Sequence, residues 1–250
     1  MSIASALGMR ETYQVILERD ALQPEGVTIV IPCYEQSHFL AEALLSCTQQ
    51  TVQPVEIIVV DDGSTPMHAA KTEEHCSNYH ARYVRVTNRG LPSARNTGLM
   101  LTRSDAFLPL DADDWIDPCY IEKMYPLLRD ADVVVPGLQE HGPTRNGTYM
   151  PGYDRPLDQV TVDVMWDFNR TYYCSLFRTE LLKSVGGYNG RMTDGFEDYD
   201  LAIDLMSRGA RYKGLDEVLF HYRTRPDGML TDAMGKQHLI KAEMRRHHQM

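Results

Sequence analysis

The chain has 250 residues, of which 43% are hydrophobic and 24% are charged, and its formal net charge is -10. This composition excludes a disordered chain, a collagen-like fibre and a disulfide scaffold, and the length suits one large domain better than two small ones. The negative charge argues against broad, non-specific nucleic-acid binding. Widely spaced cysteines without a C-x-x-C motif indicate reduced thiols. With no apolar segment of the ~20 residues that a membrane span needs, we expect a cytoplasmic protein.

The first half of the chain alternates between strand and helix patterns. Apolar, β-branched runs predict strands at Val27–Tyr34, Val55–Val60, Tyr83–Val86, Phe107–Leu110 and Val133–Val135. Helices are predicted after Ser37, as an N-cap, and after Asp117, which is followed by a proline. Strands that are apolar throughout and alternate with helices predict an α/β fold, with a mostly parallel sheet covered on both faces.

The second half is less regular. Frequent Gly, Pro, Asn and Asp predict a loop over 137–160. Helices are predicted over 161–185, 197–208 and 232–248, and a strand over Glu217–Tyr222. The last helix is basic, because residues 236–250 carry a net charge of +3. A basic helix can touch an anionic surface, but it is more typical of a solvated face.

Polar clusters follow three of the predicted strands. They are Pro32-Cys33-Tyr34-Glu35, Asp61-Asp62-Gly63-Ser64 and Asp111-Ala112-Asp113-Asp114. Ligands of an open parallel sheet bind outside the carboxyl ends of its strands, so we expect the clusters to meet at one edge. Their carboxylates would repel one another, and a divalent cation would offset this; oxygen ligands favour Mg²⁺ or Mn²⁺ over Zn²⁺. Alternatively, the acidic residues only cap the helices that follow.

A further loop runs into a helix over 88–98. Small residues at a helix N-terminus attract phosphate, and Arg95 adds a cation there. Taken alone, this pattern is more typical of a surface loop.

Read together, these motifs resemble the nucleotide-sugar half of a family 2 glycosyltransferase. The matching segments are VIPCYE, VVDDGS, NRG with ARNTG, and LDADD; segments at 177–201 and 221–223 resemble the acceptor side and the closing segment of that family. The resemblance implies the GT-A fold, with a Rossmann-like, mostly parallel sheet. On it we expect an N-terminal helical extension at 1–26, a nucleotide-sugar-binding half at 27–135, an acceptor-binding half at 136–231 and a basic helix at 232–250.

The resemblance implies that residues near the strand ends bind the donor. These are Pro32, Tyr34, Glu35, Asp61, Asp62, Asn88, Arg95, Asp111 and Arg223. Within this set, Asp62 would accept hydrogen bonds from the base or ribose, and Arg95 would lie under the nucleotide. Arg223 would clamp the diphosphate, although an arginine at a strand end is as often simply exposed.

The Asp-x-Asp element of the family matches Asp111-Ala112-Asp113 and implies Mn²⁺ or Mg²⁺ as cofactor. Asp111 would face the ribose or the water of the metal, and Asp113 would ligate the metal that bridges the diphosphate. Asp114 is a competing ligand that the sequence does not separate from Asp113. His221 is a candidate for a further metal contact, with simple exposure as the alternative.

The match to the family base falls on Asp198, with Glu197 second. Acidic residues in the first turn of a helix are also favoured by its dipole, which would explain them without catalysis. A single base opposite the leaving group implies inversion of anomeric configuration. Trp166, Tyr172 and Tyr173 are candidates for stacking on a sugar or base, with core packing as the alternative.

The resemblance thus implies a metal-dependent glycosyltransferase that uses a nucleotide-sugar. A UDP-sugar is the expected donor, because it is the commonest donor of the family. The alternatives are a catalytically silent nucleotide-sugar-binding module and a nucleotidyltransferase, although the latter normally needs a Gly-rich, basic loop after the first strand. The acceptor stays open: a glycan, a lipid-linked sugar or a protein comes before a modified nucleic acid. A lipid-linked acceptor would require peripheral contact with a membrane. The sequence does not predict the oligomeric state.

Overall fold

The computed structural model describes residues 24–143, 149–150, 160–226 and 233–248. Most of the predicted extension at 1–26, and most of the loop predicted over 137–160, therefore lie outside the described residues. Within the described ranges, no helix has the length and apolar character needed to cross a membrane.

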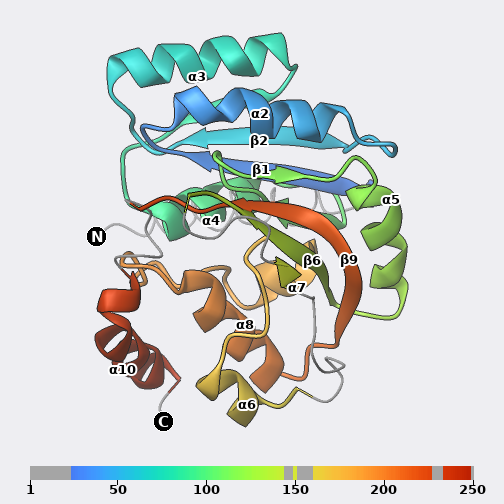
Figure 1. The fold of residues 1–250 in the computed structure, drawn as a ribbon, viewed down its shortest axis with the longest axis vertical. Coiled ribbons are helices and arrows are strands. Elements are labelled where there is room, and N and C mark those ends of the chain that lie inside the picture. Colours follow the sequence, from blue (N-terminus) through green and yellow to red (C-terminus); the bar gives the residue numbers. More distant parts are fainter. Residues whose placement is uncertain (1–23, 144–148, 151–159, 227–232, 249–250) are drawn as a thin grey trace, which may run out of the picture.

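A single mixed β-sheet runs through the described part of the chain (Figure 1). Its strands lie in the order β3-β2-β1-β4-β8-β6-β9-β5, and β7 pairs with β6. The strands are β1 (Val27–Cys33), β2 (Glu56–Asp61), β3 (Arg82–Arg85), β4 (Ala106–Pro109), β5 (Trp115–Ile116), β6 (Val133–His141), β7 (Tyr149–Met150), β8 (Leu176–Arg178) and β9 (Tyr212–Arg223).

Helices cover both faces of this sheet (Figure 1). They are α2 (Ser37–Thr48), α3 (Pro66–Asn78), α4 (Leu91–Leu101), α5 (Tyr120–Met124), the 3-10 helix η1 (Tyr125–Arg129), α6 (Val162–Asp167), α7 (Thr179–Ser184), α8 (Glu197–Ser207) and α10 (Gln237–His247). Side chains of α2, α3 and α5 build the core on one face, and those of α4, α7 and α8 build it on the other. A third apolar cluster joins α6, α8 and α10.

The half of the sheet from β3 to β4 is parallel, as the strand patterns predict. Side chains of β1 alternate between the two cores: Ile29 and Ile31 pack with α2, and Val30 packs with α4. Both faces of β1 are therefore buried, which explains why its sequence is apolar apart from Thr28. The register pairs Cys33 with Asp61, so that β1 and β2 end at the same edge of the sheet.

The other half of the sheet mixes the two strand directions. β8 is antiparallel to β4 and β6, whereas β9 is parallel to β6 and antiparallel to β5. β6 is longer than the strand predicted at Val133–Val135, and its last residue, His141, pairs with Arg223 at the end of β9. This pairing carries the end of β9 to the sheet edge where the acidic residues after β4 lie.

Three local predictions are wrong. The helix predicted over 161–185 is interrupted by β8, because this segment completes the sheet between β4 and β6. The helix predicted to follow Asp117 begins at Tyr120, and Asp117 Oδ1 instead accepts a hydrogen bond from the backbone N–H of Cys119 (3.0 Å). Ser37 is the first residue of α2 and not its N-cap.

Candidate functional site

A pocket of about 290 Å³ brings two acidic motifs together. Asp111, which follows β4, lines it from one side, and Glu197 and Asp198, which begin α8, line it from the other. The rest of the lining is largely apolar or aromatic: Leu91, Arg95, Leu138, Glu140, Asn169, Thr171, Tyr172, Tyr173, Gly195, Phe196, Phe220, Tyr222 and Ala233. The pocket therefore offers carboxylates on opposite sides of a partly apolar space.

Arg95 ties the two sides of this pocket together. Its guanidinium donates to Asp111 Oδ1 (2.7 Å) and to Glu197 Oε1, and only 1% of the side chain is exposed. It also lies near the rings of Tyr173 (4.9 Å) and Tyr188 (5.4 Å). The charge of Arg95 is thus already paired inside the protein, and its predicted place under the nucleotide stays a prediction.

Asp198 has the properties of a proton acceptor. It lies half-buried in the first turn of α8, and burial together with the adjacent charge of Glu197 raises its pKa to about 7, against the opposing effect of Arg95. A base works best when its pKa lies near the operating pH. Glu197 is more deeply buried and is paired with Arg95, so Asp198 is the better candidate of the two.

The structure separates the two candidate metal ligands that the sequence could not. Asp114 is buried, with Oδ1 accepting from the backbone N–H of Arg223 (2.7 Å) and Oδ2 from the hydroxyl of Tyr173. Asp113 is partly exposed, and burial followed by the charge of Asp111 raises its pKa to about 6. Both oxygens of Asp114 are thus bonded within the protein, whereas the Asp113 carboxylate is partly exposed, and which of the two binds a metal stays a prediction.

Two arginines at and just after the end of β9 contact Asp113. Arg225 forms an ion pair with Asp113 Oδ2 (3.0 Å), and Arg223 Nε donates to the backbone carbonyl of Asp113 (2.8 Å). The guanidinium of Arg223 also lies over the rings of Phe39 and Trp115. Sequence reasoning named Arg223 but missed Arg225. The sequence signal that could have identified Arg225 is its spacing of two residues from Arg223, because side chains at this spacing share one face of an extended segment.

His221 is engaged with aromatic neighbours. Its ring stacks on Trp115, with centroids 5.3 Å apart and planes at 7°, and its Nδ1 lies 3.0 Å from Nε2 of His141. Burial, and then the neighbouring charge of His141, lower the pKa of His221. A neutral imidazole is thus favoured here, but its predicted metal contact stays a prediction.

The four predicted metal ligands do not form a closed cage. Among the described residues, Asp111, Asp113, Asp114 and His221 do not bring three ligand atoms within 4.8 Å of one another. Mg²⁺ is usually held by one or two carboxylates together with substrate phosphates, so Asp111 and Asp113 suit a metal that arrives with its substrate.

The aspartates after β2 bond to nearby loops. Asp62 is buried, and its carboxylate accepts from the backbone N–H groups of Arg89 (3.0 Å) and Gly90 (2.8 Å). Burial raises the pKa of Asp62. Asp61 accepts from the backbone N–H of Ser64 (2.8 Å). Both residues shape the loops at this edge, and their predicted contact with a donor stays a prediction.

The remaining predicted donor contacts lie outside the lining of the pocket. Pro32 is buried in β1, whereas Tyr34 and Asn88 are exposed. Glu35 accepts from the backbone N–H (2.5 Å) and the hydroxyl (3.1 Å) of Thr65. Pro32, Tyr34 and Glu35 thus lie at the end of β1 and Asn88 follows β3, and none of them lines the cavity of Asp111 and Asp198.

The three aromatic candidates have different surroundings. Trp166 is buried in the apolar cluster between α6, α8 and α10, so its core alternative is the observed one. Tyr173 lines the pocket but is held by Asp114 and by the backbone N–H of Asp111 (3.1 Å). Tyr172 also lines the pocket. Of the three, Tyr172 is best situated to contact a ligand.

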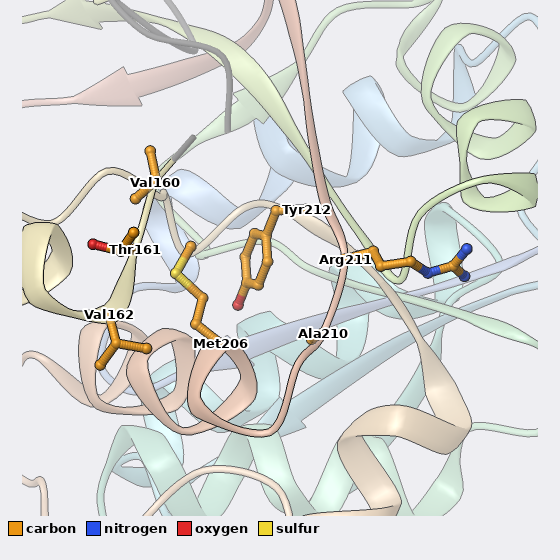
Figure 2. Close-up of a pocket in the computed structure, with 7 residues that line it drawn as sticks. All are labelled: Val160, Thr161, Val162, Met206, Ala210, Arg211 and Tyr212. Carbon is orange, nitrogen blue, oxygen red and sulfur yellow. The ribbon is translucent and has the colours of Figure 1, made fainter. Parts of the chain in front are cut away.

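A second pocket, of about 480 Å³, lies near α6 and the end of α8 (Figure 2). It is lined by Val160, Thr161, Val162, Met206, Ala210, Arg211 and Tyr212. Figure 2 shows the Arg211 side chain directed away from the others, and its guanidinium pairs with Asp132 (3.0 Å). No carboxylate lines this pocket, whereas Asp111, Glu197 and Asp198 line the first one. The first pocket is therefore the candidate active site.

Comparison with solved structures supports the fold. S. aureus TarS 1-349 in complex with UDP superposes with a TM-score of 0.67 at 19% identity, over 88% of this chain and 65% of that chain. A mannosyltransferase from Pyrobaculum calidifontis, solved with GDP-Man and Mn²⁺, gives a TM-score of 0.65 at 20% identity, over 95% and 71% of the two chains. The predicted α/β fold of the GT-A type is confirmed.

Sequence comparison identifies the family. Glycosyltransferase GlyA of Streptococcus pneumoniae serotype 4 is 26% identical over 254 residues, which cover 89% of this chain but 36% of GlyA. The chain thus spans about a third of that relative. The family model described as glycosyl transferase family 2 matches residues 28–186, which confirms the resemblance seen in the sequence motifs. The chain therefore belongs to glycosyl transferase family 2.

Proposed function

We propose that this chain transfers a sugar from a nucleoside-diphosphate sugar to an acceptor hydroxyl group. The observation that carries the proposal is the shared pocket, which is lined by both Asp111 and Asp198. The bound molecules of the structural neighbours support it, because TarS was solved with UDP and with UDP-GlcNAc, and the mannosyltransferase with GDP-Man. A UDP-sugar is the first donor to test.

In this proposal Asp198 is the general base. It takes the proton of the acceptor hydroxyl while the acceptor oxygen attacks the anomeric carbon, and the nucleoside diphosphate leaves from the opposite side. Such proton transfer typically contributes about 10²–10⁴ to the rate. One base facing one leaving group implies inversion of configuration. We assign the donor side to residues 27–135 and the acceptor side to 136–231.

Asp113 and Asp111 would hold Mg²⁺ or Mn²⁺, in keeping with their partly exposed carboxylates. When bound, the ion supplies positive charge that offsets the charge developing on the departing diphosphate. In this structure Arg225 pairs with Asp113, so a cationic group already lies at this position. Once released from Asp113, the Arg225 guanidinium can bind a phosphate oxygen.

The pocket also suggests the acceptor class. Tyr172, Phe220 and Tyr222 line it, and aromatic rings of this kind suit the apolar face of a sugar. Because the net charge of -10 disfavours nucleic acid, we favour a glycan, a lipid-linked sugar or a protein over a modified nucleic acid.

The decisive experiment is a panel of UDP- and GDP-sugars tested by calorimetry with and without Mn²⁺. At least one donor is expected to bind more tightly with the metal, and Asp113→Ala is expected to abolish that difference. Asp130→Ala is the matched control, since this exposed aspartate precedes β6 at the far end of that strand from His141. Equal donor affinity in the presence and absence of Mn²⁺ would contradict the metal role. Donor binding without release of nucleoside diphosphate would instead indicate a silent binding module.

Activity is expected to depend on pH through Asp198. The base must be ionised, and its pKa is about 7, so kcat/KM should fall about tenfold for each pH unit below that value. Initial rates from about pH 5 to about pH 9, at constant metal concentration, would measure this. The residual activity of Asp198→Asn should lack this acid limb. A flat wild-type profile across pH 7 would remove Asp198 from the role.

A further inference from the structure

A second group of metal-ligating side chains lies where the end of α10 meets the start of α8. Asp200, His247 and His248 each offer one ligand atom, and these atoms all lie within 4.8 Å of one another. His247 Nδ1 is 3.1 Å from Asp200 Oδ2, and His248 Nε2 is 3.1 Å from Asp200 Oδ1. None of the three lines the pocket of Asp111 and Asp198.

The 3.1 Å distances from the two histidine nitrogens to the carboxylate oxygens of Asp200 are close to those between the ligands of a small tetrahedral ion. Metal–ligand bonds of about 2.0–2.1 Å keep the ligand atoms of tetrahedral zinc roughly 3.3 Å apart. Two imidazole nitrogens with one carboxylate are typical zinc ligands, whereas Mg²⁺ and Mn²⁺ prefer oxygen ligands. His247 and His248, which are consecutive residues at the end of α10, both contact the carboxylate of Asp200. The three side chains could therefore bind one ion together.

The surroundings hold the ligands in position. Asp200 is 1% exposed, and Asn189 Nδ2 donates to its Oδ2 (3.2 Å), as supporting groups of metal-bound carboxylates commonly do. His248 packs edge-on against Trp166, with centroids 5.7 Å apart. The side chain of His247 is 44% exposed, which leaves a route for an ion from solvent.

We propose that Asp200, His247 and His248 form a Zn²⁺ site that fastens α10 to α8. Asp200 lies in the same first turn of α8 as Asp198, and Ala233, shortly before α10, lines the catalytic pocket. A metal at this position would therefore hold the C-terminal helix against the wall of that pocket. Three protein ligands leave the remaining coordination to water. This site is independent of the proposed transfer reaction and prefers a different metal.

The test is a zinc titration of tag-free, chelator-treated protein in competition with a chromophoric chelator. The wild type is expected to bind one equivalent of Zn²⁺. His247→Ala and His248→Ala should each weaken binding by at least about 100-fold, since even the loss of a supporting group costs 10–100-fold. His238→Ala is the matched control, because this histidine is exposed on the same helix, and it should bind zinc as the wild type does.

Two further measurements separate this site from other sources of binding. Zn²⁺ should raise the Tm of the wild type and of Asp113→Ala, but not that of His248→Ala. Substitution by Co²⁺ should give no thiolate charge-transfer absorption, which excludes the cysteines as ligands. The proposal would be overturned if the wild type bound no zinc, or if both histidine variants bound zinc as tightly as the wild type. In that case the two histidines would only form hydrogen bonds with Asp200. Because no donor is present, either result is distinguishable from failure of the transferase proposal.

Discussion

Asp198→Asn is expected to lower kcat by about 10²–10⁴ and to change the affinity for the donor little. The substitution keeps the shape of the side chain and removes its capacity to accept a proton. Donor affinity should survive because most of the predicted donor residues lie at or after the ends of β1, β2 and β4, whereas Asp198 is the second residue of α8. Initial rates and donor calorimetry on the same preparation would measure the two effects.

The same substitution should not destabilise the fold. The pKa of Asp198 is raised from 3.8 to about 7, so between these values the folded state binds a proton more tightly than the unfolded state. The contribution of Asp198 to the free energy of unfolding therefore falls as the pH rises from about 4 to about 7. Above about pH 7 the residue is ionised in the folded state, and the destabilisation is complete. Removing the charge should leave Tm at about pH 8 equal or higher.

A control lies on the same helix. Asp204→Asn alters an aspartate of α8 that pairs with Arg208 (2.9 Å), and it should leave kcat unchanged. If Asp198→Asn retains wild-type turnover, the base is another group. Loss of donor affinity equal to the loss of kcat would instead assign Asp198 to binding.

The strands of the parallel half could be predicted because their own residues carry the pattern that burial on both faces requires. A strand covered on both faces is apolar at most of its positions, and β1 and residues 57–60 of β2 show this directly. β8 could not be predicted in the same way, since it is a three-residue strand that pairs with β4 and β6. So short a run has no detectable period, and its structure comes from its neighbours.

The acidic residues show the same limit at the site. By sequence, Asp113 and Asp114 are equivalent, and only the fold separates them. The backbone N–H of Arg223, 109 residues away in the chain, bonds to Asp114. Likewise Arg95 pairs with Glu197 across 102 residues. Sequence motifs thus indicated which strand ends carry the acidic residues, but partners from distant segments decide which of these carboxylates are bonded within the protein and which stay partly exposed.

Arg95→Met is expected to destabilise the protein by about 3–5 kcal/mol, which is typical when one partner of a buried ion pair is removed. Asp111 and the deeply buried Glu197 would both lose their cationic partner. Urea unfolding would measure the change in the free energy of unfolding. Arg103→Met, which alters an exposed arginine just after α4, is the control and should be nearly neutral. An unchanged free energy of unfolding in Arg95→Met would contradict this account.

Arg95→Lys distinguishes the geometry of this arginine from its charge. An ammonium group keeps the positive charge but lacks the planar fork that can bond two carboxylates at once, so the stability loss should be smaller than for methionine. Arg95 also opposes the rise in the pKa of Asp198. In Arg95→Met the acid limb of the pH profile should therefore move to higher pH, and in the lysine variant it should move less. A merely structural arginine would lower stability without moving this limb, so the position of the limb tests whether Arg95 tunes the base.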